Sequence, residues 1–169
     1  MSIISKFIVV LIIGIIGCVG TDNDKTSFTS GTDQQYSGIR LKGLDEQIID
    51  LRKYKGKTIF INVWATWCRP CIEEMPSIEK AQNMLRNKAV VFLLASGEST
   101  EEINSFRNTH KYNFNYARIE NSEGIGIQVL PTTYIFNPDG KLVFLESGYR
   151  KWDENNNIEM VLKFATKNE

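Results

Sequence analysis

The sequence has 169 residues with 20 basic and 20 acidic side chains, so its formal net charge is zero. A nucleic-acid-binding protein normally carries a basic excess that neutralises phosphates, which argues against that class. Hydrophobic residues make up 42% of the chain, enough for a globular core and too many for a disordered protein. Three cysteines are too few for a disulfide-stapled scaffold, and the single histidine, His110, excludes most all-histidine metal sites.

An export signal is predicted at residues 1–17. Lys6 precedes an apolar run at residues 7–16, which is shorter than the roughly 20 residues that a membrane-spanning helix needs. The run leads into residues 15–18 (IIGC), which resemble the lipobox of bacterial lipoproteins. This resemblance implies that Cys18 carries a lipid and becomes the N-terminus of the mature chain. A plain signal peptide, or a short anchor helix with an incidental Cys18, is the alternative.

A flexible tether is expected at residues 18–35, where Thr, Ser, Asp and Gly predominate and almost nothing can be buried. The folded domain is then predicted to cover residues 36–169. Strands are predicted near residues 38–41 and 48–50, and at 58–63, 89–95, 115–119, 132–136 and 142–146. Helices are predicted to begin at Pro70 and at Ser99 or Thr100, with a helical turn at 122–128 and a last helix at 158–165.

The order of these elements predicts an α/β fold. A β-α-β-α unit followed by β-β-α, with short strands before it, implies a central mixed sheet with helices on both faces. The run TIFINV at residues 58–63 is mostly apolar and β-branched, as expected of a strand covered on both faces. The turn NPDG at residues 137–140 favours an antiparallel hairpin between the last two strands.

Reactive chemistry is concentrated at residues 67–71 (WCRPC), between a buried strand and a helix. Cys68 is expected just before the first helical turn, where free N–H groups and the helix dipole stabilise a thiolate. Such a thiolate is the attacking species in disulfide exchange, and Arg69 adds a positive charge nearby. Cys71 is expected one turn further on, where it can attack a mixed disulfide on Cys68.

Zinc binding and a purely structural disulfide are the alternatives for this cysteine pair. Zinc needs four ligands, and neither the distant Cys18 nor the single His110 completes such a set. No metal and no cofactor are therefore predicted. His110 is expected on a helix face with Ile103 and Phe106.

The strand and the cysteine motif together resemble the thioredoxin superfamily. Residues 60–71 (FINVWATWCRPC) look like its active-site stretch. Residues 73–76 (EEMP) look like the TlpA/ResA subfamily of membrane-tethered, extracytoplasmic thiol–disulfide oxidoreductases. The resemblance runs from about Gly38 to the C-terminus, and it implies a thioredoxin-like fold with a redox-active Cys68–Cys71 disulfide.

Further site residues carry over from this resemblance. Pro131, in the segment LPTT, matches a cis-proline that faces the cysteine pair and keeps its neighbouring backbone free for substrate. Glu74 matches a glutamate that helps proton transfer, and a carboxylate shielded from water has a raised pKa. An ordinary trans proline and a solvated surface glutamate are the alternatives. Asn62 stands where the thioredoxin type has an aspartate, so more of the proton transfer is expected at Glu74.

Two tryptophans flank the motif. Trp64 is expected in the core, and Trp67 at an exposed rim beside the nucleophile. Pro76 is expected to interrupt the hydrogen-bond ladder of the helix and to kink it.

These features predict a lipid-anchored thiol–disulfide oxidoreductase in a bacterial cell envelope. The resemblance implies that Cys68 attacks a disulfide of a protein substrate, Cys71 resolves the mixed disulfide, and a membrane electron donor reduces the pair again. Family members often reduce disulfides in an oxidising compartment, for instance in apocytochromes c before haem attachment. A monomer is expected.

Two other functions stay open on the sequence alone. The first is an oxidant that donates disulfides, and the second is a non-catalytic binding module or copper carrier. A peroxidase is disfavoured because the sequence lacks a Pro-x-x-x-Thr-x-x-Cys nucleophile segment.

Overall fold

A computed structural model describes residues 35–166 of the chain. The predicted export signal, Cys18 and nearly all of the predicted tether lie outside the described residues. The described part contains a seven-stranded sheet in the order β2-β1-β5-β4-β3-β6-β7. The strands are β1 (Leu41–Gly43), β2 (Ile48–Ile49), β3 (Thr58–Trp64), β4 (Val90–Ser96), β5 (Tyr116–Ile119), β6 (Thr132–Phe136) and β7 (Leu142–Ser147). The helices are α1 (Arg69–Met84), α2 (Thr100–Thr109) and α3 (Asn155–Ala165), with short 3₁₀ helices η1 (Gln35–Gly38) and η2 (Leu51–Tyr54).

The sheet is mixed, as predicted. β3 pairs in parallel with β4, and β4 with β5, whereas the other neighbouring strands pair antiparallel. All seven residues of β3 are buried, which agrees with the nearly continuous apolar run in its sequence. The predicted hairpin joins β6 to β7, and its turn is closed by the Gly140 N–H, which donates to the Asn137 carbonyl at 2.8 Å.

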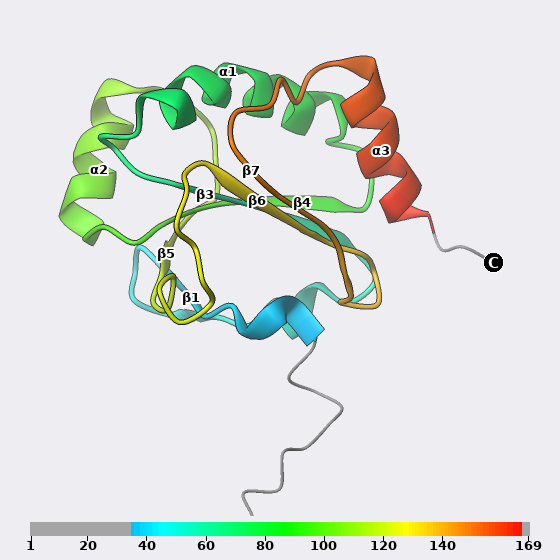
Figure 1. The fold of residues 1–169 in the computed structure, drawn as a ribbon, viewed down its shortest axis with the longest axis horizontal. Helices are drawn as coiled ribbons and strands as arrows, with labels where there is room; N and C mark the ends of the chain where they lie inside the picture. Colours follow the sequence, from blue (N-terminus) through cyan, green and yellow to red (C-terminus); the bar gives the residue numbers. More distant parts are fainter. Residues whose placement is uncertain (1–34, 167–169) are drawn as a thin grey trace, which may run out of the picture.

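Side chains on the two faces of the sheet form two separate apolar clusters, because neighbouring residues of a strand point to opposite faces. On one face, α1, α2 and α3 pack over side chains such as Phe60 and Leu94. On the other face, η1, η2 and the loop at residues 121–130 cover side chains such as Ile61. Figure 1 shows the three α-helices above the sheet and η1 below it. Helical segments thus lie on both faces, as predicted, but all three α-helices share one face.

Helix α1 begins soon after β3, beyond a turn at residues 65–67. Cys68 is its N-cap residue, and Pro70 lies in its first turn, where the missing N–H leaves no hydrogen bond unmade. Its buried face includes Met75 and Ile78, and Pro76 lies inside the helix. Helix α2 begins with a capping box in which Ser99 and Glu102 bond each other's backbone N–H groups.

Three boundaries differ from the sequence predictions by two residues or more. β1 begins at Leu41 instead of near residue 38, because residues 35–38 form η1 with Gly38 at a φ of +65°. Helix α3 begins at Asn155, three residues before the predicted start, since its first turn is polar and carries no apolar signal. The predicted helical turn at 122–128 is shorter, with hydrogen-bonded turns at residues 122–126.

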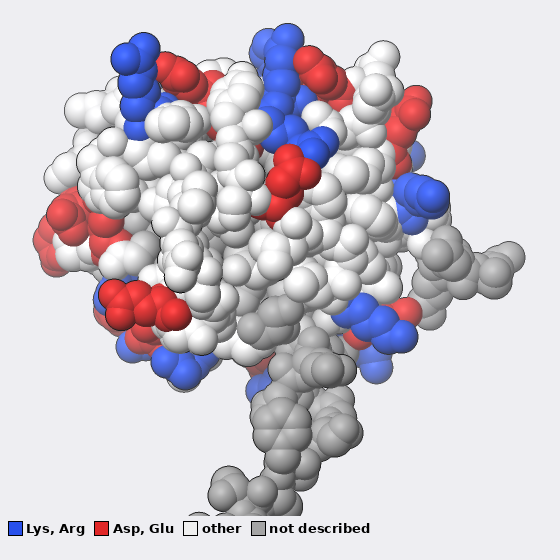
Figure 2. Space-filling view, viewed as in Figure 1, with Lys and Arg blue, Asp and Glu red and all other residues white. Residues whose placement is uncertain are grey.

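The surface carries both signs of charge. On the face shown in Figure 2, acidic and basic side chains lie mostly around the edge and the centre is largely uncharged. This mixture agrees with a formal net charge of zero. Within residues 35–166, no helix combines the length and the apolar character needed to cross a membrane.

Candidate active site

Cys68 and Cys71 form a disulfide at the N-terminus of α1. The Cys71 N–H donates to Sγ of Cys68 at 3.3 Å, so a backbone donor points at this sulfur. First-turn N–H groups and the helix dipole favour negative charge at such a position. The Cys68 sulfur thus lies at the helix N-terminus, the position where the sequence predicts the attacking cysteine.

A cleft of about 760 Å³ opens beside Cys68. Both cysteines are buried members of the apolar cluster beneath the helices, Cys68 at 4% exposure and Cys71 at 1%, but only Cys68 lines this cleft. Trp64 is buried and Trp67, at 75% exposure, lies at the rim of the cleft, both as expected. The lining also includes the apolar residues Pro70, Ile127 and Leu130 and the polar residues Glu98, Ser122 and Gln128.

Arg69 lines the same cleft but pairs with a neighbour on its own helix. Its Nε lies 2.7 Å from Oε1 of Glu73, and both side chains are well exposed. The guanidinium expected beside Cys68 is therefore engaged in an ion pair at the helix surface.

Pro131 directly follows Leu130, which lines the cleft, in the connection that leads into β6. The Leu130–Pro131 peptide bond is cis, the isomer that the resemblance implies. Pro131 directly precedes β6, which pairs with β3, and its carbonyl accepts the Gly148 N–H at 2.7 Å. Because Leu130 and Cys68 line one cleft, the segment before β6 and the cysteine pair lie on the same site.

Glu74 is fully buried in α1, one helical turn after Cys71. Its Oε1 accepts the indole N–H of Trp152 and the backbone N–H of Arg150 at 3.3 Å, and its Oε2 accepts Nδ2 of Asn62 at 3.4 Å. Burial raises the pKa of Glu74 to about 7, although these three donors and the charge of Arg150 oppose the rise. Glu74 is thus no solvated surface residue, and its carboxyl can gain or lose a proton near neutral pH.

Asn62 connects Glu74 to the strand that follows Pro131. It lies on β3 opposite Thr133 of β6, and its Nδ2 also donates to Oγ1 of Thr133 at 3.0 Å. Its Oδ1 has no hydrogen-bond partner within the described residues. A side-chain amide does not titrate near neutral pH, so proton exchange among these buried groups falls to Glu74.

Two residues of this region are not found by reasoning from the sequence. Trp152, in the connection between β7 and α3, donates to Glu74 across 78 positions of sequence. Glu98, just beyond β4, lines the cleft and accepts hydrogen bonds from Thr66. Of the two, only Glu98 has a signal in the sequence: it follows a predicted strand, and residues at the carboxyl ends of parallel strands gather at one edge of a sheet.

His110 is placed as expected, on a helix face. It is the C-cap residue of α2, and its ring stacks on Phe106 with 4.0 Å between the ring centroids. Among residues 35–166, no group of three or more His, Cys, Asp or Glu side chains is placed to hold a metal ion.

Known proteins are similar to this chain in sequence and in fold. Residues 32–145 match the AhpC/TSA family. Two relatives from Bacillus subtilis are the thioredoxin-like protein YneN, 31% identical over 122 residues, and the thiol-disulfide oxidoreductase ResA, 29% identical over 128 residues. These alignments cover 68% and 73% of this chain, and 71% and 70% of the relatives. A crystal structure of a candidate DsbE thiol:disulfide interchange protein from Chlorobium tepidum matches with a TM-score of 0.66 at 20% identity, over 75% of this chain and 92% of that chain.

The structural likeness shows a thioredoxin-like fold, with a mixed sheet and three α-helices within residues 35–166. The family match spans the cysteine pair and Pro131, and the named relatives include a thiol-disulfide oxidoreductase. The chain belongs to the AhpC/TSA family of thioredoxin-like proteins, and it is a thiol–disulfide oxidoreductase.

Proposed function

We propose that this protein reduces disulfides of exported proteins outside the cytoplasmic membrane, with Cys68 as its nucleophile. The observation that carries the proposal is the Cys68–Cys71 disulfide at the N-terminus of α1, where only Cys68 of the pair lines the cleft. A disulfide in that position is the oxidised form that one round of substrate reduction leaves behind.

The exchange proceeds in two steps. In the reduced protein, the Cys68 thiolate attacks one sulfur of a substrate disulfide, and the other substrate sulfur leaves as a thiolate. The Cys71 thiolate then attacks Sγ of Cys68, which releases the second substrate sulfur and restores the Cys68–Cys71 disulfide. Two electrons pass from the cysteine pair to the substrate, and the protons of the two cysteine thiols balance the two substrate thiols formed.

Glu74 is the proposed proton carrier on the buried side of the pair. Cys71 is almost fully buried, so the proton of its thiol needs an acceptor inside the protein. Glu74 lies one turn further along α1, and its pKa of about 7 suits it to accept this proton as Cys71 becomes a thiolate.

Pro131, Trp67, Arg69 and Pro70 are the proposed docking residues for the substrate. Trp67, Arg69 and Pro70 line the cleft beside Cys68. The resemblance implies that the backbone next to Pro131 pairs with an extended segment of the substrate. Recognition of this kind depends on backbone and apolar contact, so it accepts substrates of varied charge.

The location rests on the sequence. Removal of residues 1–17 would leave Cys18 as a lipid-bearing N-terminus, and residues 18–35 would tether the domain at residues 36–169 to a membrane. A monomer held in this way reduces disulfides of envelope proteins, apocytochromes c being one example, and a membrane electron donor reduces Cys68–Cys71 again. Incorporation of labelled lipid into the wild-type chain, and its absence from Cys18→Ser, is the expected result in cells.

A redox titration of the protein in thiol buffers tests the proposed direction. A reductase is expected to have a potential near that of thioredoxin, about −270 mV, whereas a disulfide donor lies close to −120 mV. Rapid alkylation of one thiol after mild reduction is also expected, and it would count against a non-catalytic binding module. A Cys68→Ser variant that still reduces a protein disulfide at the wild-type rate would contradict the assignment of the nucleophile.

A further inference from the structure

The carboxylate of Glu98 is bonded to the turn that holds the nucleophile. The Thr66 N–H donates to Oε2 of Glu98 at 2.7 Å, and the Thr66 hydroxyl donates to Oε1 at 2.6 Å. The Ser96 hydroxyl donates to Oε2 at 2.9 Å. Both carboxylate oxygens are therefore engaged, and two of the three donors belong to one residue. Hydrogen bonds to an ionised acceptor are shorter and stronger than neutral ones.

Thr66 lies two residues before Cys68, in the short turn between β3 and α1. Inside this turn, the Cys68 N–H donates to the carbonyl of Ala65 at 3.1 Å. Trp67 projects outward and is largely exposed, so its side chain gives the turn little packing. The bonds from Thr66 to Glu98 therefore join this turn to the residue just beyond β4.

The loop that carries Glu98 is itself held at both ends. On the β4 side, the Glu98 N–H donates to Oγ of Ser96 at 3.2 Å. On the α2 side, Ser99 forms the capping box, and the Thr100 hydroxyl donates to Oε1 of Glu46 at 2.9 Å.

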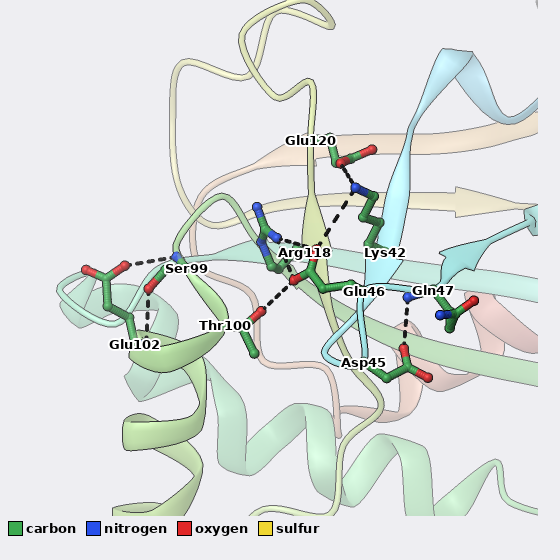
Figure 3. Close-up of polar contacts among 9 residues, drawn as sticks. All are labelled: Lys42, Asp45, Glu46, Gln47, Ser99, Thr100, Glu102, Arg118 and Glu120. Carbon is green, nitrogen blue, oxygen red and sulfur yellow. Dashed lines mark hydrogen bonds and ion pairs between the residues drawn. The ribbon is translucent and has the colours of Figure 1, made fainter.

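Glu46 is fixed in turn by Arg118 of β5. Figure 3 shows the Arg118 guanidinium and the Thr100 hydroxyl converging on the Glu46 carboxylate. One Arg118 nitrogen donates to both oxygens of Glu46, at 2.8 and 2.9 Å. The start of α2 is thereby bonded to the β1–β2 turn, and Glu98, two residues before Thr100, sits on a restrained backbone.

We propose that Glu98 is a positioning residue that acts through Thr66 to hold the Cys68 turn in the geometry needed for attack. This inference rests on Cys68 being the nucleophile, as proposed above. In the oxidised state, the disulfide also restrains Cys68. Once it is reduced, that restraint is gone, and the bonds from Thr66 to Glu98 keep the N-cap position of Cys68. Because correct placement of a nucleophile lowers the barrier of the attack step, loosening the turn is expected to lower kcat more than it changes KM.

A double-mutant cycle with Thr66→Val and Glu98→Gln tests the proposal. Valine keeps the shape of Thr66 and removes its hydroxyl, while glutamine keeps the size of Glu98 and removes one acceptor and the charge. Each single variant is expected to lower kcat for reduction of a protein disulfide about tenfold, with KM within about twofold. Because the two residues share the hydroxyl–carboxylate bond, the loss of kcat in the double variant is expected to be smaller than the product of the two single losses. Glu101→Gln, on the exposed first turn of α2, is the matched control and keeps the wild-type kcat.

The outcomes separate this inference from the function on which it rests. Thermal unfolding of each variant identifies those that are folded at the assay temperature. A folded Glu98→Gln with wild-type kcat, or losses that multiply in the double variant, would overturn the positioning role while leaving the nucleophile intact. An inactive wild-type protein, or an active Cys68→Ser, would instead overturn the proposed function.

Discussion

The surroundings of the Cys68–Cys71 disulfide differ on its two sides, although both cysteines are buried. On the outer side, Cys68 lines an open cleft whose rim carries the exposed side chain of Trp67. On the inner side, Cys71 is followed one turn later by Glu74, which is fully buried and accepts the Trp152 indole N–H. The disulfide thus lies between an open cleft and a buried polar group.

This difference fits the tasks proposed above for the two sides. A thiolate at the helix N-terminus has to meet a bulky protein substrate, which requires an accessible cleft. A proton carrier needs a pKa near neutrality, and burial of Glu74 supplies one. The same fold satisfies both needs because the disulfide lies where β3 ends and α1 begins, at the surface of the apolar cluster.

The largest expected effect comes from replacing each of the two cysteines in turn with serine. Cys68→Ser removes the proposed nucleophile and is expected to lower the rate of disulfide reduction by roughly 1,000-fold or more. Cys71→Ser keeps the nucleophile and removes the resolving thiol, so a covalent mixed disulfide with the substrate is expected to accumulate. Mass spectrometry under non-reducing conditions measures the adduct. Cys18→Ser is the cysteine control: it is expected to reduce disulfides at the wild-type rate and to accumulate no mixed disulfide. An adduct on Cys71 in the Cys68→Ser variant would reverse the assignment of the two cysteines.

The next largest effect is a fall in the free energy of unfolding as the pH rises, which is caused by ionisation of Glu74. Its pKa is about 7 in the folded protein, against an ordinary value of 4.5, so the folded state holds the proton more tightly than the unfolded chain does. Stability is therefore full below a pH of about 4.5 and falls as the pH rises through about 7, by roughly 3 kcal/mol in total. Urea unfolding of the oxidised protein at pH 5 and pH 8 measures most of this fall.

A matched pair of variants isolates the contribution of Glu74. Glu74→Gln cannot ionise, so its loss of stability between pH 5 and pH 8 is expected to be smaller by roughly 2–3 kcal/mol. Glu73→Gln, on the exposed side of the same helix, is expected to keep the wild-type fall. Equal pH dependence in all three proteins would show that burial does not raise the pKa of Glu74 on the inner side of the disulfide.

Trp152 allows a further test of the inner side, because it forms a hydrogen bond with Glu74. Its indole N–H bonds the Glu74 carboxylate and opposes the effect of burial. Trp152→Phe removes this donor, worth about 1.5 kcal/mol to a charged acceptor, and is expected to raise the pKa of Glu74 by about one unit. The pH profile of kcat records this as a shift to higher pH. Trp67→Phe, on the outer side, is the control, and a shift of equal size in both variants would contradict the role of Trp152.

The sequence predicts well those elements that carry their own local signal. The run at residues 58–63 is apolar and β-branched throughout most of its length, and it forms β3 at Thr58–Trp64. Pro70 and the cysteine motif locate the start of α1 to within one residue. The first turn of α3 is polar, in contrast, and Asn157 there accepts a hydrogen bond from the guanidinium of Arg150 at 2.7 Å, a contact that no periodicity reveals.

The candidate site divides in the same way. Cys68, Cys71, Glu74 and Pro131 lie in short motifs, so a resemblance of sequence is enough to single them out. Trp152 and Glu98 act on the site through contacts 78 and 32 positions away in sequence. Such contacts depend on how β7, α3 and β4 pack around α1, and that packing is a property of the whole sheet.

The smallest expected effect is at the outer rim, and it concerns binding instead of stability. Trp67 is 75% exposed, so Trp67→Ala is expected to change the free energy of unfolding by less than about 0.5 kcal/mol. Its ring offers apolar contact to a protein substrate beside Cys68, and losing that contact is expected to raise KM about threefold to tenfold. A small-molecule disulfide is too short to reach the rim, so its reduction rate is expected to stay at the wild-type value. Met84→Ala, at the far end of α1 and also exposed, serves as the control. An unchanged KM for protein substrates would mean that the cleft interior, from Cys68 to Leu130, provides all of the docking.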